Sequence, residues 1–191
     1  MVGNSRSGTT MMGRILGNHP DIFTFKELHF FGQLWSSNET NNRLNRKESV
    51  KLFSKLLSIN KYGIFSKSDL HQFNSISESE LSNECVYALD IFKRFLDYSL
   101  KLKNHCTIPC DQTPGNVFHI HEILENFPNA KIVNMVRDPR DVLLSQKNKW
   151  KRRYLGASNI PFKEVLRSYF NYHPITISKI WNTSINSAKQ F

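Results

Sequence analysis

The sequence predicts a single α/β domain over its 191 residues. Two observations predict this class. A glycine-containing loop from Gly3 to Gly8 opens a helical pattern, which is followed by a short apolar strand. Later, the apolar run Lys131–Val136 is followed by a second helical pattern. Strands and helices that alternate in this way favour parallel strands with helices packed against them.

The composition indicates a folded chain with an anionic partner. Hydrophobic residues make up 39% of the sequence, which is enough to build a core. The formal net charge of +10 favours a nucleotide, an acidic glycan, a nucleic acid or a membrane surface as partner, although a solvated basic surface explains part of it. No apolar run reaches the roughly 18 residues of a membrane-spanning helix, and no signal peptide is recognisable.

The cysteines do not predict a metal site. Cys106 and Cys110 have three residues between them, and neither a second Cys pair nor a suitably spaced His cluster completes a zinc site. Together with Cys85 they leave one disulfide bridge open, and free buried thiols are the preferred interpretation.

The loop has the spacing of a phosphate-binding loop, with four residues between Gly3 and Gly8. Nucleoside triphosphatases place a Lys after the second Gly, whereas this chain has Thr9 there and carries its cation earlier, at Arg6. The loop therefore predicts a nucleotide phosphate held at a helix N-terminus, without the residue that handles a transferable γ-phosphate. Only two residues precede Gly3, so the strand expected before the loop is a stub or is missing.

A carboxylate and an imidazole follow the first predicted strand, Asp21–Phe25. Glu27 and His29 alternate with Leu28 and Phe30, so both face one side if the extended conformation persists. This pair at the carboxyl end of a strand suits general-base chemistry on a hydroxyl or an amine. A surface Glu beside a hydrogen-bonded His remains the alternative.

The middle and the tail of the chain predict structure rather than chemistry. Apart from one helix, the stretch from Trp35 to Asn83 looks loop-like. Apolar spacing and Gly/Pro breaks predict helices at Thr9–Asn18, Glu48–Ser58, Ser79–Lys103, Asn116–Asn126 and Phe162–Trp181, with a weak strand at Cys106–Cys110 and a turn at Asp111–Gly115.

The run Lys131–Val136 predicts the clearest buried strand, and it ends at Arg137, where a nucleoside triphosphatase has an acidic magnesium ligand. A helix is expected from about Pro139 to Trp150, with Asp138 and Asp141 as favourable charges at its N-terminus. Arg137 and Ser145 have a spacing that suits a second phosphate. An ion pair of Arg137 with one of these aspartates is the alternative.

Three segments in this order resemble sulfotransferases that use 3′-phosphoadenosine 5′-phosphosulfate (PAPS). Arg6-Ser7-Gly8-Thr9-Thr10 resembles their 5′-phosphosulfate loop. The segment from Val136 to Ser145 resembles their 3′-phosphate motif. Lys26-Glu27-Leu28-His29-Phe30-Phe31 resembles the segment that carries the catalytic Glu in heparan sulfate 3-O-sulfotransferases, and tyrosylprotein sulfotransferases also place a Glu after this loop and helix.

The resemblance implies a P-loop-containing nucleotide hydrolase-like fold, a three-layer α/β/α domain around a central parallel sheet, incomplete here at both ends. It implies that the loop, with Arg6, Ser7, Gly8, Thr9 and Thr10, holds the 5′-phosphosulfate, and that Arg137 and Ser145 hold the 3′-phosphate. Glu27 would be the general base and His29 would help to position the acceptor, with no metal involved. Many relatives have a Lys where this chain has Gln112.

The expected partner is an acceptor substrate with a hydroxyl or an amine, carbohydrate being favoured over lipid, peptide tyrosine or small alcohol. No nucleic-acid partner is expected. Two other functions stay open: a non-catalytic module that binds a nucleotide or an anionic glycan, and a P-loop kinase, which Thr9 and Arg137 disfavour. A cytoplasmic location is expected, or the Golgi lumen if an anchor precedes this chain.

Overall fold

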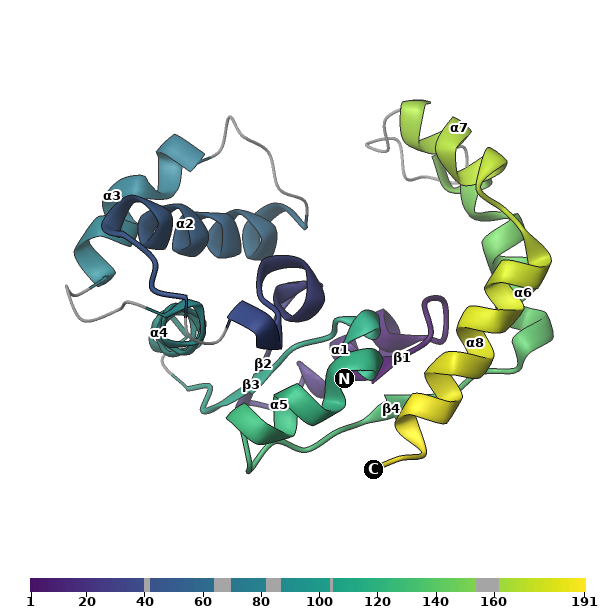
Figure 1. Cartoon of the computed structure of the whole chain (residues 1–191), viewed down its shortest axis with the longest axis horizontal. Helices are drawn as coiled ribbons and strands as arrows, with labels where there is room; N and C mark the ends of the chain where they lie inside the picture. The colour runs from purple at the N-terminus through teal and green to yellow at the C-terminus, as the bar shows by residue number, and fades with distance from the viewer. Residues whose placement is uncertain (40–41, 64–69, 82–86, 104, 154–161) are drawn as a thin grey trace.

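The structure is a computed structural model that describes the chain except for residues 40–41, 64–69, 82–86, 104 and 154–161 (Figure 1). The strands are β1 (Val2–Gly3), β2 (Ile22–Thr24), β3 (Ile108–Cys110) and β4 (Asn134–Met135). The longer helices are α1 (Thr9–Leu16), α2 (Arg46–Tyr62), α3 (Leu70–Glu80), α4 (Ala88–Lys101), α5 (Ile120–Asn126), α6 (Pro139–Lys147), α7 (Phe162–Phe170) and α8 (Pro174–Ala188). Shorter helical turns are η1 (Phe30–Leu34), η2 (Ser37–Glu39), η4 (Pro114–His119) and η5 (Lys149–Arg153).

The strands form two parallel pairs, which confirms the α/β class. β1 pairs with β4, with Val2 opposite Asn134, and β2 pairs with β3, with Ile22 opposite Ile108. The amino group of Met1 donates to the carbonyl oxygen of Asp111 at 2.5 Å, so the start of β1 lies beside the end of β3. Within each pair, the carboxyl ends of the two strands lie at the same edge, which is where ligands bind in open α/β sheets.

The larger core lies where η1, α2, α3 and α4 meet beside β2 (Figure 1). Asn45 and Glu48 form a capping box that starts α2, which explains why this helix begins before the predicted Glu48. The buried hydroxyls of Ser54 and Ser77 lie 2.7 Å apart and join α2 to α3. Aromatic rings fill the core, and the Phe30 and Phe92 rings stack with their centroids 4.0 Å apart.

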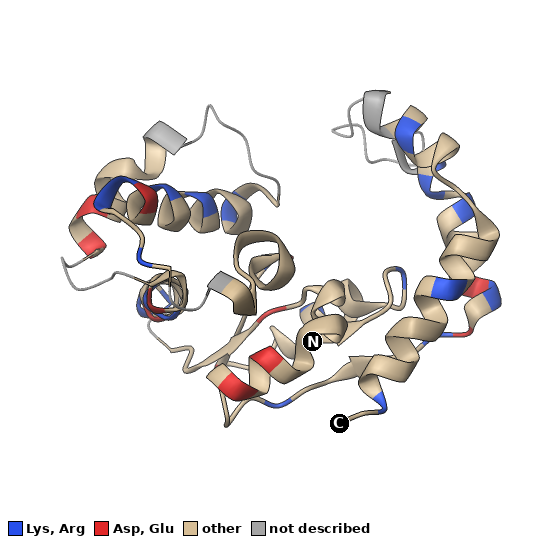
Figure 2. Cartoon of the chain, viewed as in Figure 1, with Lys and Arg blue, Asp and Glu red and all other residues tan. Residues whose placement is uncertain are grey.

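A smaller core of Val2, Val117 and Ile120 lies under β1. It is covered by α8, which contacts β1, η4 and α6. The helices α6, α7 and α8 thus form an arm on the side opposite to α2–α4, with β1 and its loop between them (Figure 1). Lys and Arg residues occur along α2 and on this arm (Figure 2).

Two helix predictions are corrected. The predicted helix Ser79–Lys103 is divided: Ser79 and Glu80 end α3, and α4 begins after Tyr87, whose backbone is extended. Helix α3 lies in the stretch from Trp35 to Asn83, which was predicted to be loop-like apart from one helix. The boundary was misplaced because α3 and α4 both contribute apolar residues to the same core, so their apolar patterns are continuous in the sequence. The predicted tail helix is also two helices, since Pro174 starts α8 and His173 caps it by accepting from the Thr176 amide.

The clearest predicted strand is short and exposed. Only Asn134 and Met135 form β4, while Val133 and Val136 are 39% and 59% exposed. The reason is that burial of a strand depends on its neighbours: β1 is two residues long, and within the described residues β4 pairs with no other strand. The predicted helices near residues 9, 116 and 139 and the strands near residues 21 and 106 are present with shorter bounds.

Candidate functional site

The loop between β1 and α1 has a backbone that favours glycine. Gly3 and Gly8 have φ of 141° and 97°, and Arg6 also adopts a positive φ of 74°. A Cβ at Gly3 would collide with the carbonyl oxygen of Met135, so glycine permits the close approach of β1 to β4. Gly8 caps α1 without a side-chain acceptor, which leaves the first amides of this eight-residue helix free of a capping bond.

Two buried side chains of the loop have a polar atom without a partner in the part of the chain that the structure describes. Asn4 and Ser7 are each 6% exposed. The Nδ2 atom of Asn4 and the Oγ atom of Ser7 have no hydrogen-bond partner among the described residues. Burying a polar group without a partner costs about 1–3 kcal/mol. Both atoms can donate a hydrogen bond, so this part of the loop is suited to an anion.

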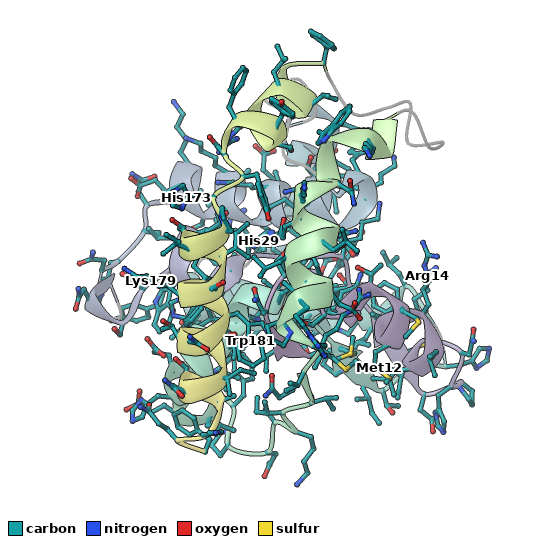
Figure 3. All side chains as sticks on the ribbon, turned by 90° about the vertical axis from the view of Figure 1, so that its right-hand side faces the viewer. Met12, Arg14, His29, His173, Lys179 and Trp181 are labelled. Carbon is teal, nitrogen blue, oxygen red and sulfur yellow. The ribbon has the colours of Figure 1, made fainter. Side chains whose placement is uncertain are left out.

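The loop is joined to the second predicted phosphate motif. Arg6 Nε donates to Ser145 Oγ at 2.9 Å, and Arg137 donates to the Arg6 carbonyl oxygen at 3.3 Å. Trp181 Nε1 on α8 donates to the carbonyl oxygen of Arg137 at 3.1 Å. Figure 3 shows α6 and α8 side by side, with Trp181 between them. Three residues predicted to bind the two ends of one nucleotide, Arg6, Arg137 and Ser145, therefore lie together.

The start of α6 accounts for the acidic residues that follow Arg137. The Asp138 side chain caps the helix by accepting from the Arg140 amide, and Pro139 occupies its first turn. The Arg140 side chain lowers the pKa of Asp138 to about 2. Arg137 does reach Asp141, as the alternative proposed, but at 3.4 Å and on the surface. This ion pair stabilises the fold little, so Arg137 is not committed to it.

Glu27 and His29 form a second cluster on the segment after β2. The buried side chains of Leu28 and Phe30 point into the larger core. His29 Nε2 lies 3.4 Å from Glu27 Oε2, and the two side chains are 37% and 44% exposed. The extended conformation that was expected ends at His29, whose φ is 51°. This left-handed backbone costs about 1–2 kcal/mol in a residue other than glycine, so the surrounding structure must hold it.

The contact with Glu27 sets the protonation of His29. The hydrogen bond that the His29 imidazole donates to the Glu27 carboxylate raises the pKa of His29 above its ordinary value, against the opposing effect of burial. A raised folded-state pKa means that the pair stabilises the fold below the unfolded pKa of about 6.5. This contribution is lost as the pH rises through the folded pKa. Since both side chains are more than a third exposed, it is worth at most about 1 kcal/mol.

The turn that follows β3 is hydrogen-bonded to the segment that carries Glu27 and His29. Asp111 Oδ1 accepts from the Thr113 hydroxyl at 2.7 Å, and Asp111 Oδ2 accepts from Asn116 Nδ2 at 2.9 Å. Thr113 Oγ1 in turn accepts from the backbone N–H of His29 at 3.3 Å. Burial raises the pKa of Asp111, and the bonds from Thr113 and Asn116 oppose that shift.

Gln112 lies in the same turn. Its Oε1 is buried without a hydrogen-bond partner in the described part of the chain, and a Cβ added at Gly13 would meet it. The Gln112 side chain is thus directed towards α1. Cys106 and Cys110 are free and half-buried, and Cys85 lies outside the described residues.

A comparison with protein families bears on the kinase alternative. The model of the sulfotransferase family matches residues 1–175. The chain belongs to the sulfotransferase family. This excludes the kinase alternative as a family assignment and makes the chain a transferase by descent. No curated protein and no solved structure matches the chain.

The candidate site combines two groups of residues that were predicted from the sequence with four residues that were not, namely Asn4, Asp111, Thr113 and Trp181. Thr9 is buried in the first turn of α1 and Thr10 is exposed beside it. Thr113 was missed because its partner His29 is distant in sequence, and Asp111 because the turn was interpreted only as a helix start. Asn4 follows no motif of its own, and its burial is visible only in the structure. Trp181 lies beyond the family match and follows no motif.

Two further observations concern the described residues alone. No helix in this part of the chain is long and apolar enough to cross a membrane. No group of three His, Cys, Asp or Glu side chains with suitable geometry for a metal ion occurs there either.

Proposed function

We propose that this chain transfers the sulfuryl group of PAPS to a hydroxyl or amine of an acceptor, with Glu27 as general base. The observation that carries the proposal is the contact between the two phosphate motifs through Arg6, Arg137 and Ser145. A nucleotide with phosphates at two positions needs two anion sites that are held close together. We also propose the P-loop-like three-layer fold that the family resemblance implies.

The residues present fit such a donor. The unpartnered Oγ of Ser7 and the first amides of α1 would bind the 5′-phosphosulfate, together with the positive end of the helix dipole. Arg137 and Ser145 would bind the 3′-phosphate. Arg6 and Ser145 are bonded to each other, so donor binding exchanges this bond for bonds to the phosphates. PAPS would supply the sulfuryl group on a good leaving group.

Glu27 and His29 would act on the acceptor. An acceptor oxygen or nitrogen forms the new bond to sulfur, the sulfur–oxygen bond to the 5′-phosphate breaks, and the acceptor proton passes to the Glu27 carboxylate. The loop donors and Arg6 stabilise the charge that builds on the departing phosphate. Positive charge on His29, favoured by its raised pKa, would help to orient the acceptor beside Glu27.

An open hollow of about 450 Å³ lies at the end of α6, and we propose it as a contact surface for an extended carbohydrate acceptor. It is lined by Lys147 and Lys151 and by the rings of Trp150 and Tyr169, whose centroids lie 5.8 Å apart. It begins two residues beyond Ser145 on the same helix. Aromatic faces stack on sugar rings, and lysines bind carboxylate or sulfate groups.

The test is transfer of labelled sulfuryl from PAPS to a panel of acceptors. The panel contains acidic and neutral oligosaccharides, a lipid headgroup, a tyrosine peptide and a small alcohol. We expect transfer to a carbohydrate and none without acceptor. If PAP, the product nucleotide, binds but no acceptor is labelled, the chain is a non-catalytic nucleotide-binding module.

A further inference from the structure

The strained backbone at His29 has a specific support in the turn after β3. Thr113 is 1% exposed and its hydroxyl makes two bonds: it donates to Asp111 Oδ1 and accepts from the amide of His29. The Asp111 carboxylate also accepts a backbone hydrogen bond from Leu28. The turn therefore binds two consecutive amides, those of Leu28 and His29.

The bonds to the amides of Leu28 and His29 lie next to the backbone torsion that sets the direction of the His29 side chain. The left-handed φ of His29 turns the chain out of the extended conformation and into η1. In an extended segment, Glu27 and His29 would share a side of the strand only as long as the backbone stayed extended. Because that conformation ends at His29, the 3.4 Å contact between the imidazole and the Glu27 carboxylate depends on the turn that holds the two amides.

The turn is itself fixed from two other directions. Asn116 Nδ2 on η4 donates to the second carboxylate oxygen of Asp111, and the Met1 amino group donates to the Asp111 carbonyl oxygen. The backbone amide of Phe25 donates to the carbonyl oxygen of Cys110, one residue before Asp111. The support is thus tied to β1, to the end of β2 and to η4.

We propose that Asp111 and Thr113 are positioning residues, which hold the amides of Leu28 and His29 so that the His29 imidazole stays in contact with the Glu27 carboxylate. The inference rests on the proposed function for its effect on catalysis. Its structural part, the geometry of the Glu27–His29 pair, stands without it. Neither residue touches the acceptor in this role.

Thr113→Val tests the proposal, because it removes the hydroxyl without replacing a charged side chain. Thr113→Ser keeps the hydroxyl and is the rescue variant, while Thr183→Val on the exposed side of α8 is the surface control. The first readout is the titration of the His29 imidazole by NMR in the full chain. We expect the pKa of His29 to fall towards its ordinary value in Thr113→Val and to stay raised in Thr113→Ser.

The second readout is kinetic. We expect kcat to fall on the order of 10–100-fold in Thr113→Val, as for a misplaced catalytic group, with unchanged PAP affinity and with recovery in Thr113→Ser. A Thr113→Val chain that keeps the His29 titration of the wild type overturns the positioning role. Unfolding of both variants, Thr113→Val and Thr113→Ser, also overturns the positioning role. If the wild type transfers no sulfuryl group, the proposed function fails, but the titration still decides whether Thr113 positions His29.

Discussion

Ser7→Ala separates the stability of the loop from its ability to bind a phosphate. The Ser7 hydroxyl is buried without a partner among the described residues, and an unsatisfied buried polar group costs about 1–3 kcal/mol. Its removal is therefore expected to raise the free energy of unfolding by about 1 kcal/mol. A hydrogen bond to a charged group is worth about 1.5–3 kcal/mol, so the same change should weaken PAP binding roughly 10- to 100-fold.

The chain offers a matched control in Ser58 on α2. Its hydroxyl is also buried and unpartnered within the described residues, but it lies in the larger core. Ser58→Ala should gain similar stability and keep full PAP affinity. Urea unfolding and calorimetry with PAP measure both quantities. The reasoning is refuted if Ser7→Ala destabilises the chain, or if both variants lose PAP affinity equally.

The remaining predictions concern the base, the arm and the glycine. Glu27→Gln should lower kcat about 10²–10⁴-fold with unchanged PAP affinity. The control Glu125→Gln, at the exposed His121–Glu125 pair, should leave kcat unchanged. Full activity of the Glu27→Gln variant would exclude Glu27 as the base. Trp181→Phe removes the bond to the Arg137 carbonyl and should weaken PAP binding roughly 2- to 10-fold by calorimetry, unaltered affinity being the contrary result. Gly3→Ala should lower both the thermal midpoint of unfolding and the affinity for PAP, because the added Cβ collides with the Met135 carbonyl oxygen. A variant with the stability and PAP affinity of the wild type would show that the loop does not need glycine at this position.

Local features of the site were predictable from the sequence. The loop and the start of α1 depend on spacings of a few residues, and the structure contains both. The spacing of Arg137 and Ser145 is also local, and both residues contact Arg6. The Asp138 cap was predictable for the same reason. Each of these features requires only the residues beside it.

Features that depend on distant neighbours were not predictable. The exposure of Val136 follows from the short β1, and the division between α3 and α4 follows from two helices that share one core. The Glu27–His29 contact was expected from alternation, but it is formed through a left-handed residue that Thr113, 84 positions away, holds in place. No periodicity in the sequence records a bond of that kind.

The central claim is that one nucleotide occupies both anion sites, the loop and the Arg137–Ser145 pair. A comparison of PAP with 5′-AMP by calorimetry tests this claim most directly. The two ligands differ by the 3′-phosphate, which Arg137 and Ser145 are proposed to bind. We predict that PAP binds with a dissociation constant on the order of micromolar and 5′-AMP at least roughly tenfold more weakly. In an Arg137→Ala chain this difference should vanish. Equal affinities of the wild-type chain for PAP and 5′-AMP would contradict the account.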